Sequence, residues 1–172
     1  MNTILVWVGK TIDKRLVSLI EDYFYRINRY QRFEIQIIPE LKNKGKMSEK
    51  LQRQKEGQLI IEKFNAGDWV VLLDEKGKSL DSVSFAKYIN AKRSSSQKRV
   101  VFVIGGPYGL SEEVYSKGNE KMALSEMTFS HQMVRLFFLE QLYRGFSGHL
   151  QTKRKYQYQC FECYLVPHNL HG

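Results

Sequence analysis

The chain has almost no cysteine: among its 172 residues, the two cysteines are Cys160 and Cys163. The part of the chain before Cys160 must therefore fold without a disulfide and without a metal site built on thiolates. Long apolar runs are also absent, since none approaches the roughly 18 residues of a membrane-spanning helix, and the first residues lack a basic stretch followed by a long apolar one. These absences predict a cytoplasmic protein with no membrane segment and no bound metal.

Acidic residues are in the minority, with 18 against 27 lysines and arginines, which gives a formal net charge of +9. An excess of this size favours a polyanionic partner, and together with 13% aromatic residues it favours RNA over a membrane surface. Charge that serves only solubility is the alternative. The length and the hydrophobic share of 42% suit one domain with a single core.

Hydrophobic patterning predicts strands that alternate with helices. Continuous or alternating apolar runs indicate strands, and amphipathic periodicity indicates helices. Strands are expected over 1–8, 33–39, 68–74 and 99–104, and helices over 11–30, 48–64, 82–93 and from about 133 onward, with Thr128 or Ser130 as the N-cap of the last helix. This order predicts an α/β fold, a three-layer sandwich around a mostly parallel sheet.

A glycine-rich loop, Gly105-Gly106-Pro107-Tyr108-Gly109, follows the predicted strand at 99–104. Glycine lets a ligand approach the backbone, so such a loop at the end of a buried strand is typical of a small-molecule site. The loop lacks the Gly-x-x-x-x-Gly-Lys-Ser/Thr order of a Walker phosphate loop and the Gly-x-Gly-x-x-Gly order of a dinucleotide site. We therefore do not expect a nucleotide hydrolase or a nicotinamide enzyme.

Four motifs occur together along the chain. They are Val71-Leu72-Leu73-Asp74-Glu75-x-Gly77-Lys78, Ile104-Gly105-Gly106-Pro107-Tyr108-Gly109, the run from Leu124 to Arg135, and Glu140-Gln141-Leu142-Tyr143-Arg144. From residue 1 to about 144 the chain resembles the RlmH family, SPOUT-class methyltransferases that act on N3 of a pseudouridine in large-subunit ribosomal RNA. The resemblance implies a C-terminal trefoil knot, S-adenosylmethionine as methyl donor, a homodimer, and ribosomal RNA in the large subunit or the assembled ribosome as partner. It also implies a SPOUT methyltransferase domain, 1–144, followed by an atypical C-terminal tail of the same domain, 145–172.

The resemblance further implies where the methyl donor binds. Matched residue by residue, the expected cofactor contacts are Leu73, Gly105, Leu124, Ser125, Glu126, Met127, Thr128 and Phe129. Backbone N–H and C=O groups can read an adenine edge, while apolar side chains enclose the ring. The alternatives are that Gly105 only makes a turn, that Met127 and Phe129 only belong to the core, and that Glu126 faces solvent.

Lys42, Lys44 and Lys46 lie in a segment with almost no apolar residues, which we name the basic loop. Lysines in such a loop can bind RNA phosphates and release counterions, although a solvated loop with no role in binding has the same composition. Arg144 matches the family's arginine near the reacting base, so the resemblance implies a catalytic role for it. His131 falls at a predicted helix start, which suits a structural hydrogen bond.

After Arg144 the chain departs from the family. The family's Tyr-His pair has no counterpart at its usual distance, and we assign no general base among His149, Tyr156, Tyr158, His168 and His171. The two cysteines with His168 and His171 have the residue types of a zinc site, but we prefer a non-native extension with incidental cysteines. Two other functions stay open: a catalytically impaired protein of the same fold that binds RNA or ribosomes, and a SPOUT methyltransferase for another RNA.

Overall fold

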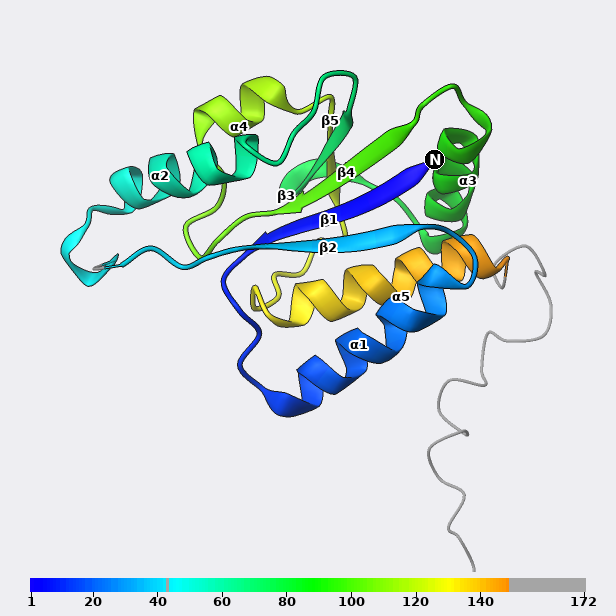
Figure 1. Cartoon of the computed structure of the whole chain (residues 1–172), viewed down its shortest axis with the longest axis horizontal. Helices are drawn as coiled ribbons and strands as arrows, with labels where there is room; N and C mark the ends of the chain where they lie inside the picture. The colour runs from blue at the N-terminus through cyan, green and yellow to red at the C-terminus, as the bar shows by residue number, and fades with distance from the viewer. Residues whose placement is uncertain (43, 149–172) are drawn as a thin grey trace, which may run out of the picture.

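A computed structural model describes residues 1–42 and 44–148, apart from the side chain of Lys44. Its centre is a five-stranded sheet in the order β2-β1-β4-β3-β5, with every pairing parallel (Figure 1). The strands are β1 (Asn2–Val8), β2 (Phe33–Ile38), β3 (Trp69–Ser79), β4 (Arg99–Ile104) and β5 (Glu120–Ala123). Because the strands are parallel, all of their carboxyl ends lie at one edge of the sheet.

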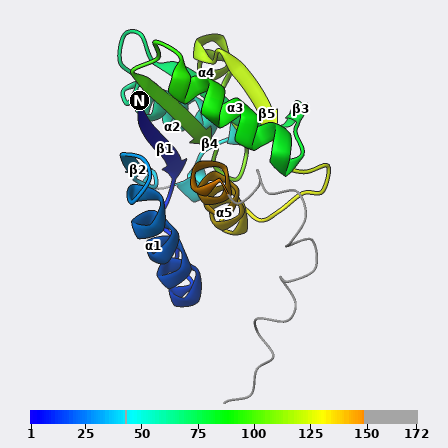
Figure 2. The same cartoon turned by 90° about the vertical axis from the view of Figure 1, so that its right-hand side faces the viewer.

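Helices cover both faces of this sheet (Figures 1 and 2). One face carries α1 (Lys14–Asn28), α3 (Ser82–Ser94) and α5 (Met133–Ser147), and the other carries α2 (Glu49–Ile61) and α4 (Glu112–Lys117). The predicted α/β class and three-layer arrangement are confirmed, while the trefoil knot stays a prediction. Among the described residues, none of the helices has the length and apolar character needed to cross a membrane.

The core consists of two clusters, one on each face of the sheet. Along β1, Trp7 points to the cluster that contains Phe138 of α5, whereas Val6 points to the cluster that contains Ile60 of α2. All four of these side chains are at most 2% exposed. A strand covered on both faces needs apolar residues at successive positions, which explains the continuous apolar runs in the sequence.

β3 extends well past its predicted end at residue 74 because β5 pairs with it on both sides of an irregularity. Met122 of β5 lies opposite Leu73 and again opposite Lys78, so residues 74–77 leave the regular ladder. Gly77 permits this close approach, since a Cβ there would lie 2.4 Å from the Met122 backbone nitrogen. Sequence patterning did not predict the short, largely polar α4 and β5.

Ser130, one of the two predicted N-caps, makes the hydrogen bonds of an N-cap at the start of α5. The helix begins at Met133 after Gln132, which makes no side-chain capping bond. The Ser130 Oγ accepts from the Met133 N–H at 3.3 Å, and the Ser130 carbonyl accepts from the Val134 N–H at 3.0 Å. The basic loop differs from expectation, because 44–46 forms a short 3-10 helix.

Candidate functional site

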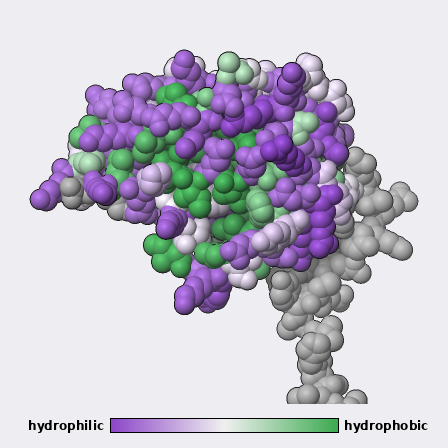
Figure 3. All heavy atoms as spheres, in the orientation of Figure 1, coloured by the Kyte–Doolittle hydropathy of each residue, from purple (hydrophilic) through white to green (hydrophobic). Residues whose placement is uncertain are grey.

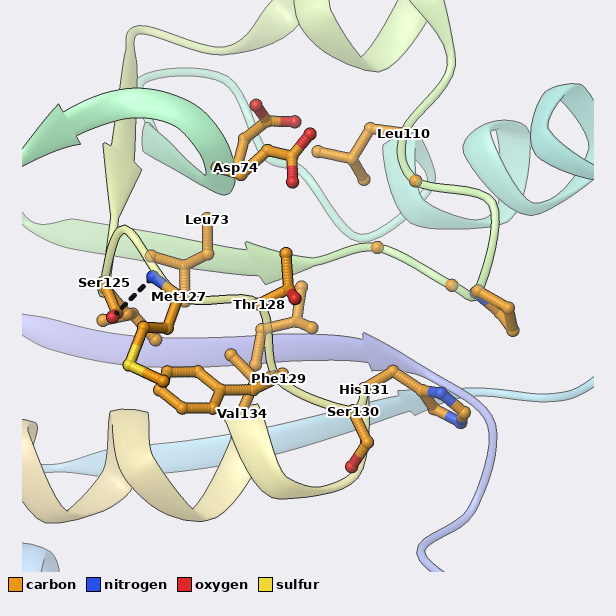
Figure 4. Close-up of a pocket in the computed structure, with 17 residues that line it drawn as sticks. Leu73, Asp74, Leu110, Ser125, Met127, Thr128, Phe129, Ser130, His131 and Val134 are labelled. Atoms are coloured by element: carbon orange, nitrogen blue, oxygen red, sulfur yellow. Dashed lines mark hydrogen bonds between the residues drawn. The ribbon is translucent and has the colours of Figure 1, made fainter.

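A pocket of about 390 Å³ lies at the carboxyl edge of the sheet (Figure 4). Its walls come from the end of β3, the glycine-rich loop after β4, and the segment that leads from β5 into α5. Ligands of open α/β sheets bind beyond the carboxyl ends of the strands, and the volume falls within the usual range for small-molecule sites. The topology therefore brings three segments that are far apart in sequence around one cavity.

Most of the predicted cofactor contacts line this pocket. They are Leu73, Gly105, Leu124, Ser125, Met127, Thr128 and Phe129. The eighth predicted contact, Glu126, is exposed and does not line the pocket, which favours the alternative that its side chain faces solvent. The role of the seven lining residues in binding a cofactor stays a prediction, but the fold does bring them together around one pocket.

The glycine-rich loop folds tightly against itself. The Gly109 N–H donates to the Gly106 carbonyl at 3.0 Å, and Gly109 has a φ of +82°, which favours glycine. Gly105 does not have a positive φ; its constraint is space, because an added Cβ would lie 3.0 Å from the Gly109 carbonyl carbon. Leu110 is 4% exposed and anchors the end of the loop in the core.

Met127 and Phe129 do not belong to the core. Met127 is 73% exposed and Phe129 is 40% exposed, so the core alternative is wrong for both residues. The Ser125 Oγ accepts a hydrogen bond from the Met127 N–H at 2.9 Å (Figure 4), and the Phe129 ring lies 4.7 Å from that of Phe137. These contacts hold the segment while leaving two apolar side chains exposed at the pocket.

The ionisable residues that line the pocket are Asp74, Glu75 and His131. The Tyr115 hydroxyl donates to Asp74 Oδ2, and the Lys76 N–H donates to Asp74 Oδ1 at 2.8 Å. Burial, together with the hydrogen bond to Asp74, raises the pKa of Tyr115, so the phenol keeps its proton and stays a donor at neutral pH. Sequence reasoning did not assign a role to Asp74; the available signal was a carboxylate at the last position of a predicted buried strand.

Arg135 fixes the start of α5 next to the end of β1. Its Nη1 donates to Thr11 Oγ1 at 2.8 Å and its Nη2 donates to the Val8 carbonyl at 2.7 Å. The side chain is 1% exposed, and burial lowers its pKa to about 10, which still leaves it charged at neutral pH. Because the neighbouring Val134 lines the pocket, this buried arginine helps to set the position of one pocket wall.

Arg144 lies at the other end of α5 and does not line the pocket. Arg144 is ten positions beyond Val134 along the helix, which corresponds to a rise of about 15 Å. Its Nη1 forms an ion pair with Glu140 Oε1 at 3.0 Å. Within one chain, the fold therefore does not bring Arg144 to the predicted cofactor contacts, and its catalytic role stays a prediction.

The basic loop follows β2 and so lies at the same edge of the sheet as the pocket (Figure 1). Lys42 and Lys46 are exposed there. The tail residues considered from the sequence lie outside the described residues, and the two cysteines with them. Within 1–42 and 44–148, no group of three or more His, Cys, Asp or Glu side chains is placed to hold a metal ion.

Comparison with known proteins identifies the family. Residues 1–156 match the family model described as "Predicted SPOUT methyltransferase". The chain is 53% identical over 147 residues to the ribosomal RNA large subunit methyltransferase H of Flavobacterium johnsoniae, an alignment covering 86% of this chain and 94% of that protein. It is 50% identical over 145 residues to the protein of the same name from Bacteroides thetaiotaomicron, with coverage of 84% and 92%. The resemblance inferred from the four motifs is thus confirmed, and the chain belongs to the SPOUT methyltransferase family.

Proposed function

We propose that this protein transfers a methyl group from S-adenosylmethionine to N3 of a pseudouridine in large-subunit ribosomal RNA. The observation that carries the proposal is the convergence of Leu73, Gly105 and the 124–129 segment on one pocket. The names of the relatives, ribosomal RNA large subunit methyltransferases, support the substrate.

The pocket suits an adenosine-containing methyl donor. Leu73 in β3 supplies apolar surface on one wall, and Met127 and Phe129 supply it on another. The glycine-rich loop supplies backbone without side chains to block approach. A planar base enclosed by apolar side chains, with backbone groups at its edge, is a common mode of small-molecule recognition. The exposed Met127 and Phe129 have apolar surface that a bound ligand would cover.

The chain contributes chiefly by positioning. When bound, S-adenosylmethionine supplies a methyl group on a positively charged sulfur, whose bond electrons stay on sulfur after transfer. The acceptor nitrogen forms its bond to carbon and loses its proton, so the protein must align the two reactants and accept or release that proton. Alignment alone can supply roughly 7–11 kcal/mol of the barrier. We propose that Arg144 acts near the acceptor base.

The RNA is proposed to contact the basic loop. The loop and the pocket share one edge of the sheet, so a strand that binds lysines there can also approach the bound methyl donor. Lysine–phosphate contacts release counterions and supply affinity without reading sequence. In this proposal the basic loop supplies affinity for RNA and the pocket supplies the chemistry.

A homodimer is proposed as the working form. Figure 3 shows hydrophobic side chains gathered over β2 and around the start of α1. Tyr25 on α1 and Ile37 on β2 are 66% and 45% exposed, and Phe137 on α5 is 37% exposed. Exposed apolar surface of this kind is typical of interfaces. Light scattering of the purified protein should give twice the chain mass, and a single-chain mass would contradict the dimer.

The experiment that tests the function has two stages. Calorimetry first measures binding of S-adenosylmethionine, and labelled methyl groups are then followed into ribosomal RNA separated by subunit. Label in large-subunit RNA supports the proposal. Binding of cofactor and ribosomes without methyl transfer would favour a catalytically impaired protein of the same fold. Label confined to another RNA would favour a SPOUT methyltransferase with a different RNA substrate.

A further inference from the structure

The candidate pocket is acidic although the chain as a whole is basic. The net charge of the chain is +9, yet the lining includes Asp74 and Glu75 and neither lysine nor arginine. In a pocket with an apolar wall, a carboxylate interacts more strongly with a ligand charge than it would in bulk water. The local charge therefore favours a cationic ligand.

Asp74 owes its position to the irregularity in β3. Residues 74–77 leave the ladder between Leu73 and Lys78, and Gly77 lets this segment approach β5. Figure 4 shows Asp74 on the Leu110 side of the pocket, across from the 125–131 segment. The carboxylate lies directly after Leu73, whose side chain is a predicted contact of the methyl donor.

Two hydrogen bonds hold the Asp74 carboxylate in place. Tyr115 donates to one oxygen and the backbone of Lys76 donates to the other. Each carboxylate oxygen can accept more than one hydrogen bond, so both oxygens can still accept a hydrogen bond from a ligand. The carboxylate is therefore preorganised for a ligand in the pocket.

We propose that Asp74 is a specificity-determining residue that favours the charged methyl donor over its neutral, demethylated product. This inference rests on the proposed function. S-adenosylmethionine carries a sulfonium charge that S-adenosylhomocysteine lacks, because the sulfur keeps the electron pair of the broken bond. A fixed carboxylate in the pocket attracts the first ligand more than the second. Methyl transfer thereby weakens binding of the product and promotes its exchange.

The other charges near Asp74 are compatible with this role. Glu75 adds a second negative charge to the lining, and His131 is the remaining ionisable residue there. Lys121 lies 4.4 Å from the centre of the Tyr115 ring, and the charges of Glu112 and Arg53 raise and lower the pKa of Tyr115, but none of these three side chains lines the pocket. The negative charge that a ligand meets in the pocket is therefore not neutralised by a cation in the lining.

The test compares two ligands in three proteins. Calorimetry measures the Kd of S-adenosylmethionine and of S-adenosylhomocysteine for wild type, Asp74→Asn and Glu113→Gln. Glu113 is an exposed acidic residue outside this pocket, so its replacement controls for the change in net charge. Asp74→Asn should weaken S-adenosylmethionine about tenfold, which is ~1.4 kcal/mol. The Kd of S-adenosylhomocysteine should change less than twofold, and the control should leave both values unchanged. An equal loss for both ligands, or no loss for either, would overturn the assignment.

Salt dependence provides a second test that needs no variant. In wild type, added KCl should weaken binding of S-adenosylmethionine more than binding of S-adenosylhomocysteine, because screening reduces the attraction between the sulfonium and the carboxylate, which the product lacks. Equal salt dependence would contradict the role of Asp74 and leave the proposed function intact. If wild type binds neither ligand, the proposed function itself fails.

Discussion

Replacing Gly105 by valine tests the pocket at a crowded point of its glycine-rich loop. An added Cβ would lie 3.0 Å from the Gly109 carbonyl carbon, 3.1 Å from its oxygen and 3.1 Å from Leu110 Cδ2, and valine adds two methyl groups beyond that atom. Because Leu110 is anchored in the core, the loop must move toward the pocket or lose its turn. Displacement by about 1 Å can cost ~10²-fold in a site that depends on alignment.

We expect Gly105→Val to weaken binding of S-adenosylmethionine at least about tenfold, or ~1.4 kcal/mol, in calorimetry. Overpacking also costs about 1–3 kcal/mol of folding free energy, so thermal unfolding must show that the variant is folded at the assay temperature. Gly45→Val is the matched control, since a Cβ at Gly45 meets no atom within 4 Å. A folded Gly105→Val protein with the wild-type Kd would refute the placement of the pocket.

Three further predictions concern RNA, the core and the tail. Neutralising the three lysines of the basic loop should reduce the slope of log affinity against log salt for ribosomal RNA by about 2–3, at roughly 0.9 per phosphate contact; an unchanged slope removes the loop from the interface. Phe138→Ala should lower the free energy of unfolding in urea by about 3–5 kcal/mol, because its fully buried ring packs 4.8 Å from Phe102, whereas Phe137→Ala at a partly exposed position should cost under about 1 kcal/mol. Methyl transfer by the chain should be about 10²-fold slower than by a variant with a short family-like tail ending in Tyr-His after Arg144, with equal cofactor binding in both; equal rates would show that the present tail is functional.

The order of elements could be predicted because the sequence patterns are strong. A strand covered on both faces, such as β4, is apolar throughout, and an amphipathic helix such as α1 repeats at helical spacing. β5 gives no such signal: two of its four residues are buried, and its pairing with β3 decides its conformation. The cap of α5 was predictable because Ser130 has the chemistry of an N-cap, and its Oγ accepts from the Met133 N–H at the start of the helix.

The residues of the candidate site that belong to a sequence motif could be predicted. The contacts between segments far apart in the sequence could not. The seven lining residues were available from the resemblance, but the hydrogen bond between Tyr115 and Asp74 joins segments that no local pattern connects. The same holds for Arg135 and the end of β1. The resemblance also grouped Arg144 with the site, and the length of α5 separates it from the pocket within one chain.

Identification of the methylated nucleoside tests the central claim most directly. Stoichiometric protein would be incubated with ribosomes that lack the modification and with S-adenosylmethionine carrying an isotopically heavy methyl group, and the large-subunit RNA would be digested to nucleosides for mass spectrometry. The account predicts a heavy methyl group on N3 of a pseudouridine, and its loss when Gly105→Val replaces wild type. A heavy methyl group on a different nucleoside, or none in large-subunit RNA although the protein binds the methyl donor, would contradict it.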